Sequence, residues 1–471
     1  MSQHYDVVIL GAGTAGLSAL NEVKKHTDNF LMVNAGAYGT TCARVGCMPS
    51  KLLIEAANAY HRSKSYATFG IVGSDALSVD MPAVMQRLRR LRDEFVAGTL
   101  EATDVLGKRS VQGRAKVLAP DCIEVNGEKI KTRSLIVATG SHPIVPTPWK
   151  AFGDRILTTD SLFEQDHFGP RLGVIGMGPV GAEMAQALAR LGVKVSAFSK
   201  GDMLAGLSDP DINAVLRGAL ETEMELHTGQ ETTLEAADGG VAIVAGDRRT
   251  VVDQVLVAVG RAPNVQDLGL ENLGVPLSEN GMPEFDVGST QVGDLRVFIA
   301  GDVNRHQPLL HEAADEGHIA GKNALADEVR CYDRRIPLAI AFVAPEAAVV
   351  GKSAASLKDQ AIETGITSFA NQGRARAGQR NLGKIALYVQ PSDGKLLGAE
   401  LCAPAGEHMA HLLGLAVTRG LTVHDLLAMP IYHPVLEEGL RTALRDAAKK
   451  SGGKPESDLA HCPPLNIPAL E

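Results

Sequence analysis

The chain has 471 residues, 49 of them glycine, and a formal net charge of −9. This length predicts two to four domains, and a hydrophobic content of 45% is typical of an α/β protein. The acidic balance disfavours nucleic acid and an anionic membrane surface as partners, and we expect no membrane span. A strand follows almost directly on the first residue and leaves no room for a signal peptide, so we expect a cytoplasmic location.

The N-terminal stretch has the pattern of a βαβ unit. The expected elements are a strand, a helix and a second strand, over residues 5–10, 17–25 and 30–33. Between the first strand and the helix stand Gly11, Gly13 and Gly16, spaced as GxGxxG. Such glycines permit a tight turn, the approach of a pyrophosphate and close helix–strand packing, so we expect a dinucleotide here. Asn34 stands where an acid usually holds a ribose, and its amide can still bond a hydroxyl.

Two cysteines, Cys42 and Cys47, precede an apolar segment. Because Pro49 is tolerated in a first turn, we expect a helix from near Cys47 to about Ser65. Residues five apart on a regular helix rise about 7.5 Å, whereas a disulfide needs Cα atoms within about 7 Å. A bridge therefore requires an irregular first turn, which Gly46 permits. A helix N-terminus favours a thiolate, so the pair has the character of a redox centre.

Cysteines at this spacing need not be redox-active. For an arbitrary pair, reduced core cysteines are the commoner case. A zinc half-site needs a second pair of ligands at matching spacing. The remaining cysteines stand singly, at Cys122, Cys331, Cys402 and Cys462. No metal site is therefore expected.

The middle of the chain repeats the nucleotide-binding theme. A long amphipathic helix is expected over 82–107, followed by short antiparallel strands over 111–136 with a hairpin turn at Asn126 and Gly127. A second GxGxxG, formed by Gly176, Gly178 and Gly181, lies between an expected strand over 172–175 and a helix over 179–191, with a further strand over 194–198. Two such units in one chain predict two different dinucleotides.

The second unit also lacks the usual acid after its second strand. Ser199 and Lys200 stand there instead. A cation at this point can accommodate a 2′-phosphate, whereas an acid would hold a free 2′-hydroxyl. The alternative is that Lys200 is simply exposed to solvent.

Two further strands end in glycine. One precedes Gly260 and Arg261, and the other, which begins at Val297, precedes Gly301 and Asp302. A carboxylate after a buried strand and a glycine is well placed to bind a polyol, although an ordinary surface turn would also account for an aspartate here. A helix is then expected from about residue 309 to 325. From residue 336 the pattern changes to a separate α+β module, with strands over 338–343, 385–389 and 396–401 and helices over 406–418 and 434–449.

His433 precedes Pro434, a residue that suits the first position of a helix. The helix N-terminus disfavours an imidazolium, while a nearby carboxylate favours it. Such a histidine is poised near neutrality, as a general base requires. A histidine and proline before a helix more often form a cap, and that alternative remains open.

In this order the motifs resemble the class I pyridine nucleotide–disulfide oxidoreductases, a flavin-dependent family. The resemblance extends to about residue 449 and rests on the cysteine stretch, both glycine fingerprints and the segments 260–264, 300–302, 342–346 and 433–434. It implies an α/β fold with two Rossmann-like dinucleotide-binding domains, for FAD and NAD(P), plus a C-terminal α+β dimerisation domain. The expected divisions are FAD-binding 1–150, NAD(P)-binding 151–270, central 271–334, dimerisation 335–449 and a flexible tail 450–471.

The resemblance also implies catalytic roles. Cys47 would be the charge-transfer thiol that faces the flavin, and Cys42 the interchange thiol that meets the substrate. Lys51 would lie near the flavin N5 and pair with Glu183. The acid–base group would be His433, oriented by Glu438 and acting on the cysteines of the other subunit of a homodimer.

Cofactor-binding roles follow in the same way. Gly11, Gly13 and Gly16 would bind the FAD pyrophosphate, Asp302 the ribityl chain, and His311 would lie below the flavin. The other residues implied for FAD are Asn34, Thr139, Gly140 and Gly301. The residues implied for NAD or NADP are Gly176, Gly178, Gly181, Ser199, Lys200, Gly260 and Arg261.

Within the family the chain looks most like dihydrolipoamide dehydrogenase, because Ser50 and Lys51 follow Pro49 and because of the His433–Pro434 pair. Soluble transhydrogenases lack the cysteine pair, and mercuric reductases usually carry a C-terminal cysteine pair where this chain has one, Cys462. We therefore expect oxidation of protein-bound dihydrolipoamide with NAD(P)⁺, within a lipoyl-bearing multienzyme complex. The alternatives are an NADPH-dependent reductase of another disulfide or of mercuric ion, and a non-catalytic flavoprotein subunit of a complex. Arg44 departs from the family pattern, which has asparagine there.

Overall fold

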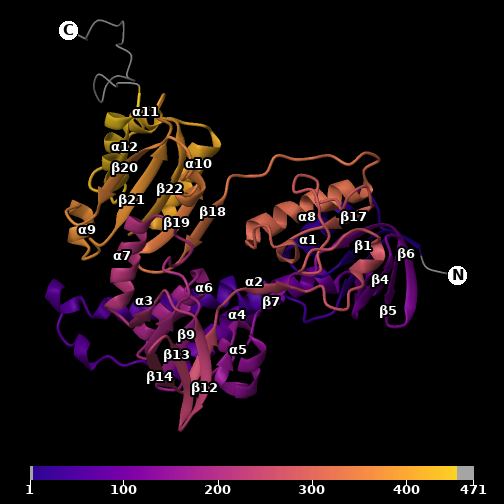
Figure 1. Cartoon of the computed structure of the whole chain (residues 1–471), viewed down its shortest axis with the longest axis horizontal. Helices are drawn as coiled ribbons and strands as arrows, with labels where there is room; N and C mark the ends of the chain where they lie inside the picture. Colours follow the sequence, from indigo (N-terminus) through magenta and orange to yellow (C-terminus); the bar gives the residue numbers. More distant parts are fainter. Residues whose placement is uncertain (1–3, 453–471) are drawn as a thin grey trace, which may run out of the picture.

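The computed structural model describes residues 4–452, which fold into three bodies (Figure 1). The N-terminal body is built on a sheet with the strand order β3-β2-β1-β6-β5-β4, in which β17 is added beside β6. The strands are β1 (His4–Leu10), β2 (Phe30–Asn34), β3 (Ser110–Gln112), β4 (Ala115–Ala119), β5 (Cys122–Val125), β6 (Glu128–Val137) and β17 (Val297–Ile299). Strand β1 pairs in parallel with β2 and β6, so the loops that follow these strands meet at one edge of the sheet.

Helices cover this sheet and extend from it. The helices are α1 (Thr14–Val23), α2 (Thr41–Val45), α3 (Cys47–Ser63), α4 (Met81–Asp104) and α8 (Leu310–Leu325). Helices α1 and α8 pack on each other, and α3 packs on α4. The predicted helices after Cys47 and over 82–107 are confirmed, with ends two or three residues earlier than expected. The hairpin turn between β5 and β6 is also confirmed, because Asn126 and Gly127 both have positive φ, 52° and 81°.

The second body repeats the βαβ arrangement. Its parallel sheet has the order β11-β10-β9-β15-β8. The parallel strands are β8 (Ile156–Leu157), β9 (Arg171–Ile175), β10 (Lys194–Phe198), β11 (Glu225–His227) and β15 (Gln254–Val257), and the helices are α5 (Thr159–Leu162), α6 (Pro179–Arg190) and α7 (Pro210–Glu221). An antiparallel sheet of β12 (Thr232–Ala237), β13 (Gly240–Ala245) and β14 (Arg248–Val252) lies beside it. A short antiparallel pair, β7 (Ser141–Pro143) and β16 (Arg261–Pro263), joins the first two bodies.

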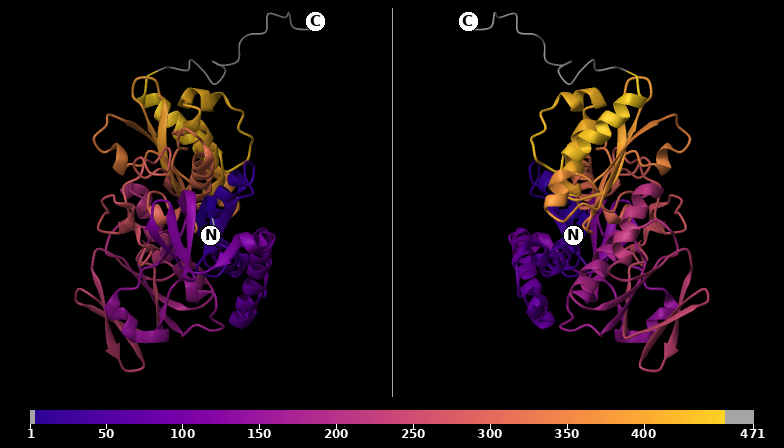
Figure 2. Two further views of the ribbon diagram at one scale, coloured as in Figure 1. Left: turned by 90° about the vertical axis from the view of Figure 1, so that its right-hand side faces the viewer. Right: turned by 90° about the vertical axis from the view of Figure 1, so that its left-hand side faces the viewer.

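The third body is an antiparallel sheet with helices against it. Its order is β18-β19-β22-β21-β20. The strands are β18 (Leu338–Ala341), β19 (Glu346–Gly351), β20 (Glu363–Ser368), β21 (Lys384–Val389) and β22 (Leu396–Ala403), and the helices are α9 (Gly373–Ala377), α10 (Gly406–Thr418), α11 (Val423–Ala428) and α12 (Glu438–Lys450). Both views in Figure 2 show this body, in yellow and orange, above the second body in magenta. The predicted fold class, two Rossmann-like units plus an α+β module, is confirmed.

One expected element of the third body is wrong at its start. The last helix begins at Glu438, not at Pro434. The Glu438 carboxylate accepts hydrogen bonds from the backbone N of Val435 and from the ring of His433, so side-chain bonds hold residues 433–437 as a turn. His433 therefore lies in this turn, and the N-cap position of the helix is Glu437. Strands β19 and β20 and helix α11 were not expected from the sequence.

A buried carboxylate fastens the second body to the third. Glu400 of β22 is fully buried. Its oxygens accept hydrogen bonds from the backbone N of Ser208, Asp209 and Ala354 at 2.7, 2.8 and 2.9 Å, and from the Ser208 hydroxyl. The Tyr388 hydroxyl adds a bond of 2.9 Å to the Asp209 carboxylate. The start of α7 is thus fixed to the sheet of the third body.

The last described residues still belong to the third body. The Lys450 ammonium donates to the carbonyl of Thr364, and the Gly452 backbone N donates to that of Pro391. The expected flexible tail, with Cys462, otherwise lies outside the described residues. Between residues 4 and 452, no helix combines the length and the apolar composition needed to cross a membrane.

Candidate active site

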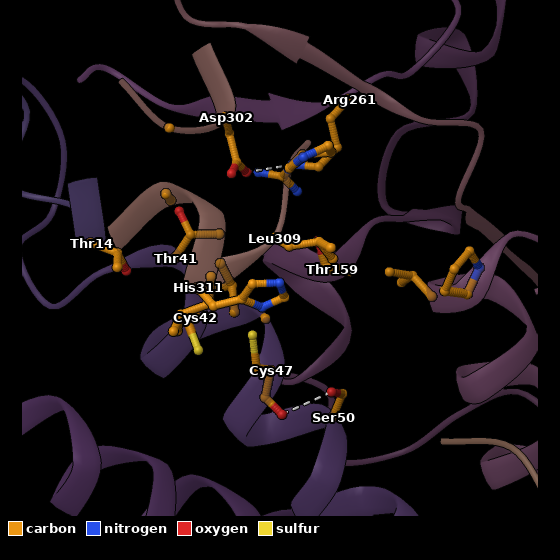
Figure 3. A pocket seen from close by; sticks show the side chains of 18 of the residues that line it. Thr14, Thr41, Cys42, Cys47, Ser50, Thr159, Arg261, Asp302, Leu309 and His311 are labelled. Atoms are coloured by element: carbon orange, nitrogen blue, oxygen red, sulfur yellow. Dashed lines mark hydrogen bonds and ion pairs between the residues drawn. The ribbon is translucent and has the colours of Figure 1, made fainter. Parts of the chain in front are cut away.

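The two cysteines lie on either side of a break between two helices. Cys42 belongs to α2 and Cys47 is the first residue of α3. Gly46 between them leaves the helical conformation, at φ −128° and ψ −116°, and a Cβ there would lie 3.0 Å from the Thr41 carbonyl oxygen. Both cysteines are free thiols, and their sulfur atoms face one another (Figure 3). The irregular turn that a bridge between them requires is therefore present.

The two thiols differ in acidity. A hydrogen bond with Cys42 is the largest influence on Cys47, and with the nearby charge of Lys51 it outweighs burial and lowers the pKa of Cys47 to about 7. The same hydrogen bond, together with burial, raises the pKa of Cys42 far above its usual range. Near pH 7 the reduced pair therefore holds Cys47 partly as a thiolate, while Cys42 stays a protonated thiol.

An ion pair secures the cation beside the cysteines. The ammonium of Lys51 lies 2.8 Å from Oε2 of Glu183, a buried residue of α6. Oε1 of Glu183 accepts a hydrogen bond from the backbone N of Phe342 at 2.9 Å. The Lys51 ammonium also lies 4.2 Å from the centroid of the Phe342 ring. Lys51, Glu183 and Phe342 each belong to a different body, so their contacts link the three bodies beside the cysteines.

The cysteines open into a cavity of about 510 Å³. Among the residues that line it are Gly13, Thr14, Cys42, Cys47, Lys51, Pro179, Val180, Glu183, Arg261, Asp302, His311, Phe342 and His411. A second cavity of about 560 Å³ shares Gly13, Gly140 and Arg261 with the first and continues to Asn34. The two cavities therefore form one elongated site, from the cysteines to the end of β2.

The first glycine fingerprint leaves room for a ligand in this site. Gly11 has φ +108°, and a Cβ there would lie 2.2 Å from the carbonyl oxygen of Ala138. A Cβ on Gly16 would lie 1.9 Å from the Gly11 carbonyl oxygen, so the strand and helix approach as closely as the motif predicts. No atom lies within 4 Å of the Cβ position of Gly13, which faces the cavity. This is the cradle that a pyrophosphate needs.

Polar groups complete the elongated site. The buried hydroxyl of Thr139 has no hydrogen-bond partner among the described residues, and it lines the outer cavity. The Asp302 carboxylate accepts a hydrogen bond from the Ser141 hydroxyl, and the Arg261 guanidinium donates to that hydroxyl and to the Ser141 carbonyl. Figure 3 shows the ion pair between Arg261 and Asp302. Arg261 thus lies beside Asp302, and both residues line the cavity of the cysteines together with Pro179 and Val180. The Asn34 side-chain oxygen accepts from the backbone N of Ala12, which fixes the glycine loop.

The second fingerprint repeats the geometry of the first. Gly176 has φ +96°, a Cβ on Gly181 would lie 1.8 Å from the Gly176 carbonyl oxygen, and Gly178 faces open space. Pro179 and Val180, at the start of α6, reach the cysteine cavity. A second dinucleotide therefore fits with its reactive end in this cavity.

At the expected ribose end of the second unit the structure shows an acid that no sequence pattern indicates. Ser199 is buried, while the Lys200 ammonium is exposed and lies 2.5 Å from the carboxylate of Glu231. Glu231 lies in the loop between β11 and β12, 31 positions from Lys200 along the chain. The two side chains therefore meet only through tertiary packing. Gly260 ends the loop before β16 with φ +120°.

His433 and Glu438 are expected catalytic residues that one chain does not bring to the cavity of the cysteines. Nδ1 of His433 lies 2.9 Å from a Glu438 oxygen, and this bond lowers the pKa of Glu438. The His433 side chain is 79% exposed and is not among the residues that line the cavity. His311, in contrast, lines the same cavity as the two cysteines (Figure 3).

Two residues that line the cysteine cavity could not be recognised from any pattern in the sequence. The buried Thr159 hydroxyl lines the cysteine cavity without a partner in the described chain. His411 enters the cavity wall from α10 of the third body. Neither residue belongs to a motif, since each reaches the site only through the packing of the three bodies.

Comparison with known proteins decides the family. Residues 5–317 match the model of the pyridine nucleotide-disulphide oxidoreductases, and residues 337–444 match the dimerisation domain of the same family. The chain belongs to this family. Its cofactors are accordingly FAD and a pyridine nucleotide, and it is a flavoprotein disulfide oxidoreductase. The matched dimerisation domain supports a homodimer.

Relatives within the family carry different names. The chain is 32% identical to a dihydrolipoyl dehydrogenase of Thermus scotoductus, over 95% of this chain and 98% of that protein. It is 29% identical to a mercuric reductase of Staphylococcus aureus, over 93% of this chain and 82% of that protein. Among solved structures it is similar to the flavoprotein disulfide reductase RclA from Escherichia coli, with a TM-score of 0.82, 21% identity and coverage of 94% and 99%. LpdA from Mycobacterium tuberculosis is similar with a TM-score of 0.81, 24% identity and the same coverage. The last two likenesses show the fold alone.

Proposed function

We propose that this disulfide oxidoreductase oxidises protein-bound dihydrolipoamide with NAD(P)⁺ through Cys42 and Cys47. The observation that supports this most is the opposed acidity of the two thiols at the wall of one cavity. Such a pair suits exchange with a dithiol, because one sulfur leaves readily and the other accepts attack. The dihydrolipoyl dehydrogenase names among the relatives support the choice of dithiol.

The exchange begins with Cys42 and Cys47 joined as a disulfide. One substrate thiolate attacks Sγ of Cys42, and Cys47 leaves as a thiolate, which its low pKa favours. The second substrate thiol, deprotonated, attacks the substrate sulfur of the mixed disulfide and releases Cys42. The products are the cyclic substrate disulfide and two reduced cysteines. FAD, when bound, carries the two electrons from Cys47 to the pyridine nucleotide.

Lys51 and Glu183 hold a cation at the cysteines. The Lys51 charge stabilises the Cys47 thiolate, and Glu183 fixes the ammonium in place. For FAD we assign Gly11, Gly13 and Gly16 to the pyrophosphate, Asp302 to the ribityl chain, and Asn34, Thr139, Gly140, Gly301 and His311 to further contacts. For the pyridine nucleotide we assign Gly176, Gly178, Gly181, Ser199, Lys200, Gly260 and Arg261.

The proton acceptor is His433 of the partner subunit. In its own chain His433 is exposed and absent from the cavity wall, so only another copy can bring it to the cysteines. Glu438 accepts the Nδ1 proton of this imidazole, which leaves Nε2 free to take the substrate thiol proton. The partner's imidazole therefore activates the dithiol that attacks Cys42.

A side-by-side assay tests the substrate. Lipoamide, glutathione disulfide and mercuric ion are each offered with NADH and with NADPH. Lipoamide should be reduced with the highest kcat/KM, since a reversible dithiol–disulfide exchange is catalysed in both directions. A higher value for another acceptor would refute dihydrolipoamide as the substrate and leave the disulfide oxidoreductase unchanged.

The second candidate is an NADPH-dependent reductase of mercuric ion or of another disulfide, which the mercuric reductase relative favours. The candidate from another class is a non-catalytic flavoprotein subunit of a multienzyme complex. Anaerobic titration with NADH separates the latter from an enzyme. A long-wavelength absorbance band on reduction indicates a thiolate at Cys47 in contact with the flavin, whereas its absence with FAD bound would support the binding role.

A further inference from the structure

The outer half of the elongated site carries positive charge that the chain does not neutralise. The strongly charged side chains that line this cavity are Arg44, Arg114, Arg261 and Asp160. Arg261 is hydrogen-bonded to Ser141 and ion-paired with Asp302, whereas the guanidinium groups of Arg44 and Arg114 have no hydrogen-bond or ion-pair partner in residues 4–452. Asp160 is exposed at the rim. The site is therefore cationic and suits an anionic ligand.

Arg44 is held in this position by its surroundings. It is half-buried in α2, and its aliphatic stem lies over Gly39. A Cβ on Gly39 would lie 3.2 Å from Cδ of Arg44, so the glycine makes room for the stem. An unpaired guanidinium that is partly withdrawn from water is costly unless an anion meets it. The Arg44 guanidinium is thus held in place by its surroundings and has no anionic partner among residues 4–452.

Among residues 4–452 no carboxylate is hydrogen-bonded to or ion-paired with the Arg44 guanidinium, although Asp160 lines the same cavity. Asn34 occupies the position after β2 where the family usually has an acid. The Asn34 side chain is neutral and also holds the loops, because its Oδ1 accepts from the backbone N of Ala12 and its Nδ2 donates to the carbonyl of Gly36. An anionic ligand in this cavity can therefore supply the counter-charge for Arg44.

The glycine loop lines the same cavity and identifies the ligand chemistry. Gly11 and Gly13 leave the cradle described above, which suits a diphosphate. We propose that Arg44 binds the diphosphate of FAD, and that Arg114 adds a weaker, exposed contact to the same group. A guanidinium matches phosphate because its planar fork donates two parallel hydrogen bonds. This proposal depends on the assignment of FAD to the elongated site.

The test measures FAD retention and ligand competition with the full chain. Holoenzymes of wild type, Arg44→Gln, Arg44→Lys and Arg114→Gln are diluted, and the release of FAD is followed by the recovery of flavin fluorescence. Re-binding of FAD is then measured with ADP or adenosine as the competitor. Arg87→Gln is the control, since Arg87 is an exposed arginine of α4 that lies outside the cavity wall.

Arg44→Gln should raise the FAD dissociation constant about tenfold to a hundredfold, as expected for a charge-assisted hydrogen bond. Arg44→Lys should recover part of the lost FAD affinity, because lysine restores the positive charge but not the two parallel hydrogen bonds of the guanidinium. ADP should compete less well in Arg44→Gln than in wild type, while adenosine competes equally in both. Arg114→Gln should give the same pattern with a smaller loss.

Two results would overturn the proposal. Unchanged FAD and ADP affinities in Arg44→Gln would show that Arg44 binds no phosphate, and equal losses for ADP and adenosine would show that it acts only on the local fold. A wild-type chain in which ADP fails to displace FAD would instead contradict the placement of FAD in this site.

Discussion

At the scale of single residues, one hydrogen bond sets the chemistry of the cysteine pair. The thiol of Cys42 is the largest influence that lowers the pKa of Cys47 to about 7. In Cys42→Ser a hydroxyl still donates this bond, whereas Cys42→Ala removes the donor. We expect the reduced wild type and Cys42→Ser to be alkylated by iodoacetamide at Cys47 with a midpoint near pH 7, and Cys42→Ala with a higher midpoint. The same midpoint in both variants would contradict the role of the hydrogen bond.

The same variants separate the roles of the two sulfur atoms. Cys42→Ser should retain FAD and the long-wavelength band, because the thiolate of Cys47 remains, and should lose disulfide reduction. Cys47→Ser should lose the band. Equal loss of the band in both variants would refute the assignment.

The pyridine nucleotide preference depends on the contact between Lys200 and Glu231. Both side chains are largely exposed, at 77% and 76%, so the pair adds little to stability and is free to exchange partners. A 2′-phosphate would compete with Glu231 for Lys200. We expect detectable use of NADPH, a shift toward NADH in Lys200→Glu, and a shift toward NADPH in Glu231→Gln. The measurement is the ratio of the two kcat/KM values, and a ratio that neither substitution changes would mean that both residues are bystanders.

Site features formed by residues close together in the sequence were easier to predict than features formed by residues far apart in it. The irregular turn at Gly46 could be predicted, because cysteines five residues apart on a regular helix lie too far apart to form a disulfide. The Lys51–Glu183 pair was expected only from the family resemblance, since 132 positions separate the partners. Glu231 and the orphaned hydroxyl of Thr159 could not be predicted, because each reaches the site through tertiary packing that no local pattern encodes.

At the scale of elements, the joint between α7 and β22 should make a large contribution to stability. Glu400→Gln places an amide NH₂ against backbone N–H groups that now donate to a carboxylate. We expect a loss of about 3 kcal/mol in the free energy of unfolding, from a charged acceptor removed and donors left unpaired. Chemical denaturation measures it. Glu363→Gln on β20 is the control, and equal midpoints for the two variants would contradict a special role for Glu400.

Helix α8 contains a carboxylate that should make stability depend on pH. Burial raises the pKa of Glu316 to about 7, although the backbone N of Gly301 and the charge of Arg334 oppose this. The folded chain therefore holds the Glu316 proton more tightly than the unfolded chain. Between the ordinary carboxyl pKa of 4.5 and about 7 this group's contribution to stability falls as pH rises. Glu316→Gln should show a smaller fall in Tm from about pH 5 to about pH 8 than wild type, and equal falls would contradict the raised pKa.

The elements themselves were predictable to different degrees. Both βαβ units combine buried strands with glycine turns, and their ends were correct within about three residues. Strand β20 was missed because it is short, mostly polar and at a sheet edge. The start of α12 was wrong because Pro434 suits a helix as well as a turn, and the bonds of Glu438 decide between them.

At the scale of the whole molecule, the position of His433 predicts a shared active site. Cys42→Ser subunits mixed with His433→Ala subunits should form heterodimers with one doubly defective site and one intact site. Activity should therefore reappear, approaching half of the wild-type value for a pure heterodimer. Verified heterodimers without recovery would mean that His433 acts within its own chain.

The joint at Glu400 also determines how electrons cross the molecule. The second body is fastened to the third by the bonds of one buried side chain, and to the first by the ion pair of Lys51 and Glu183. Its cofactor end already opens into the cavity of the cysteines through Pro179 and Val180. The second body can therefore present its nucleotide to the cysteine cavity without a swing of the whole domain, and we expect the catalytic rate to be largely independent of the viscosity of the solvent.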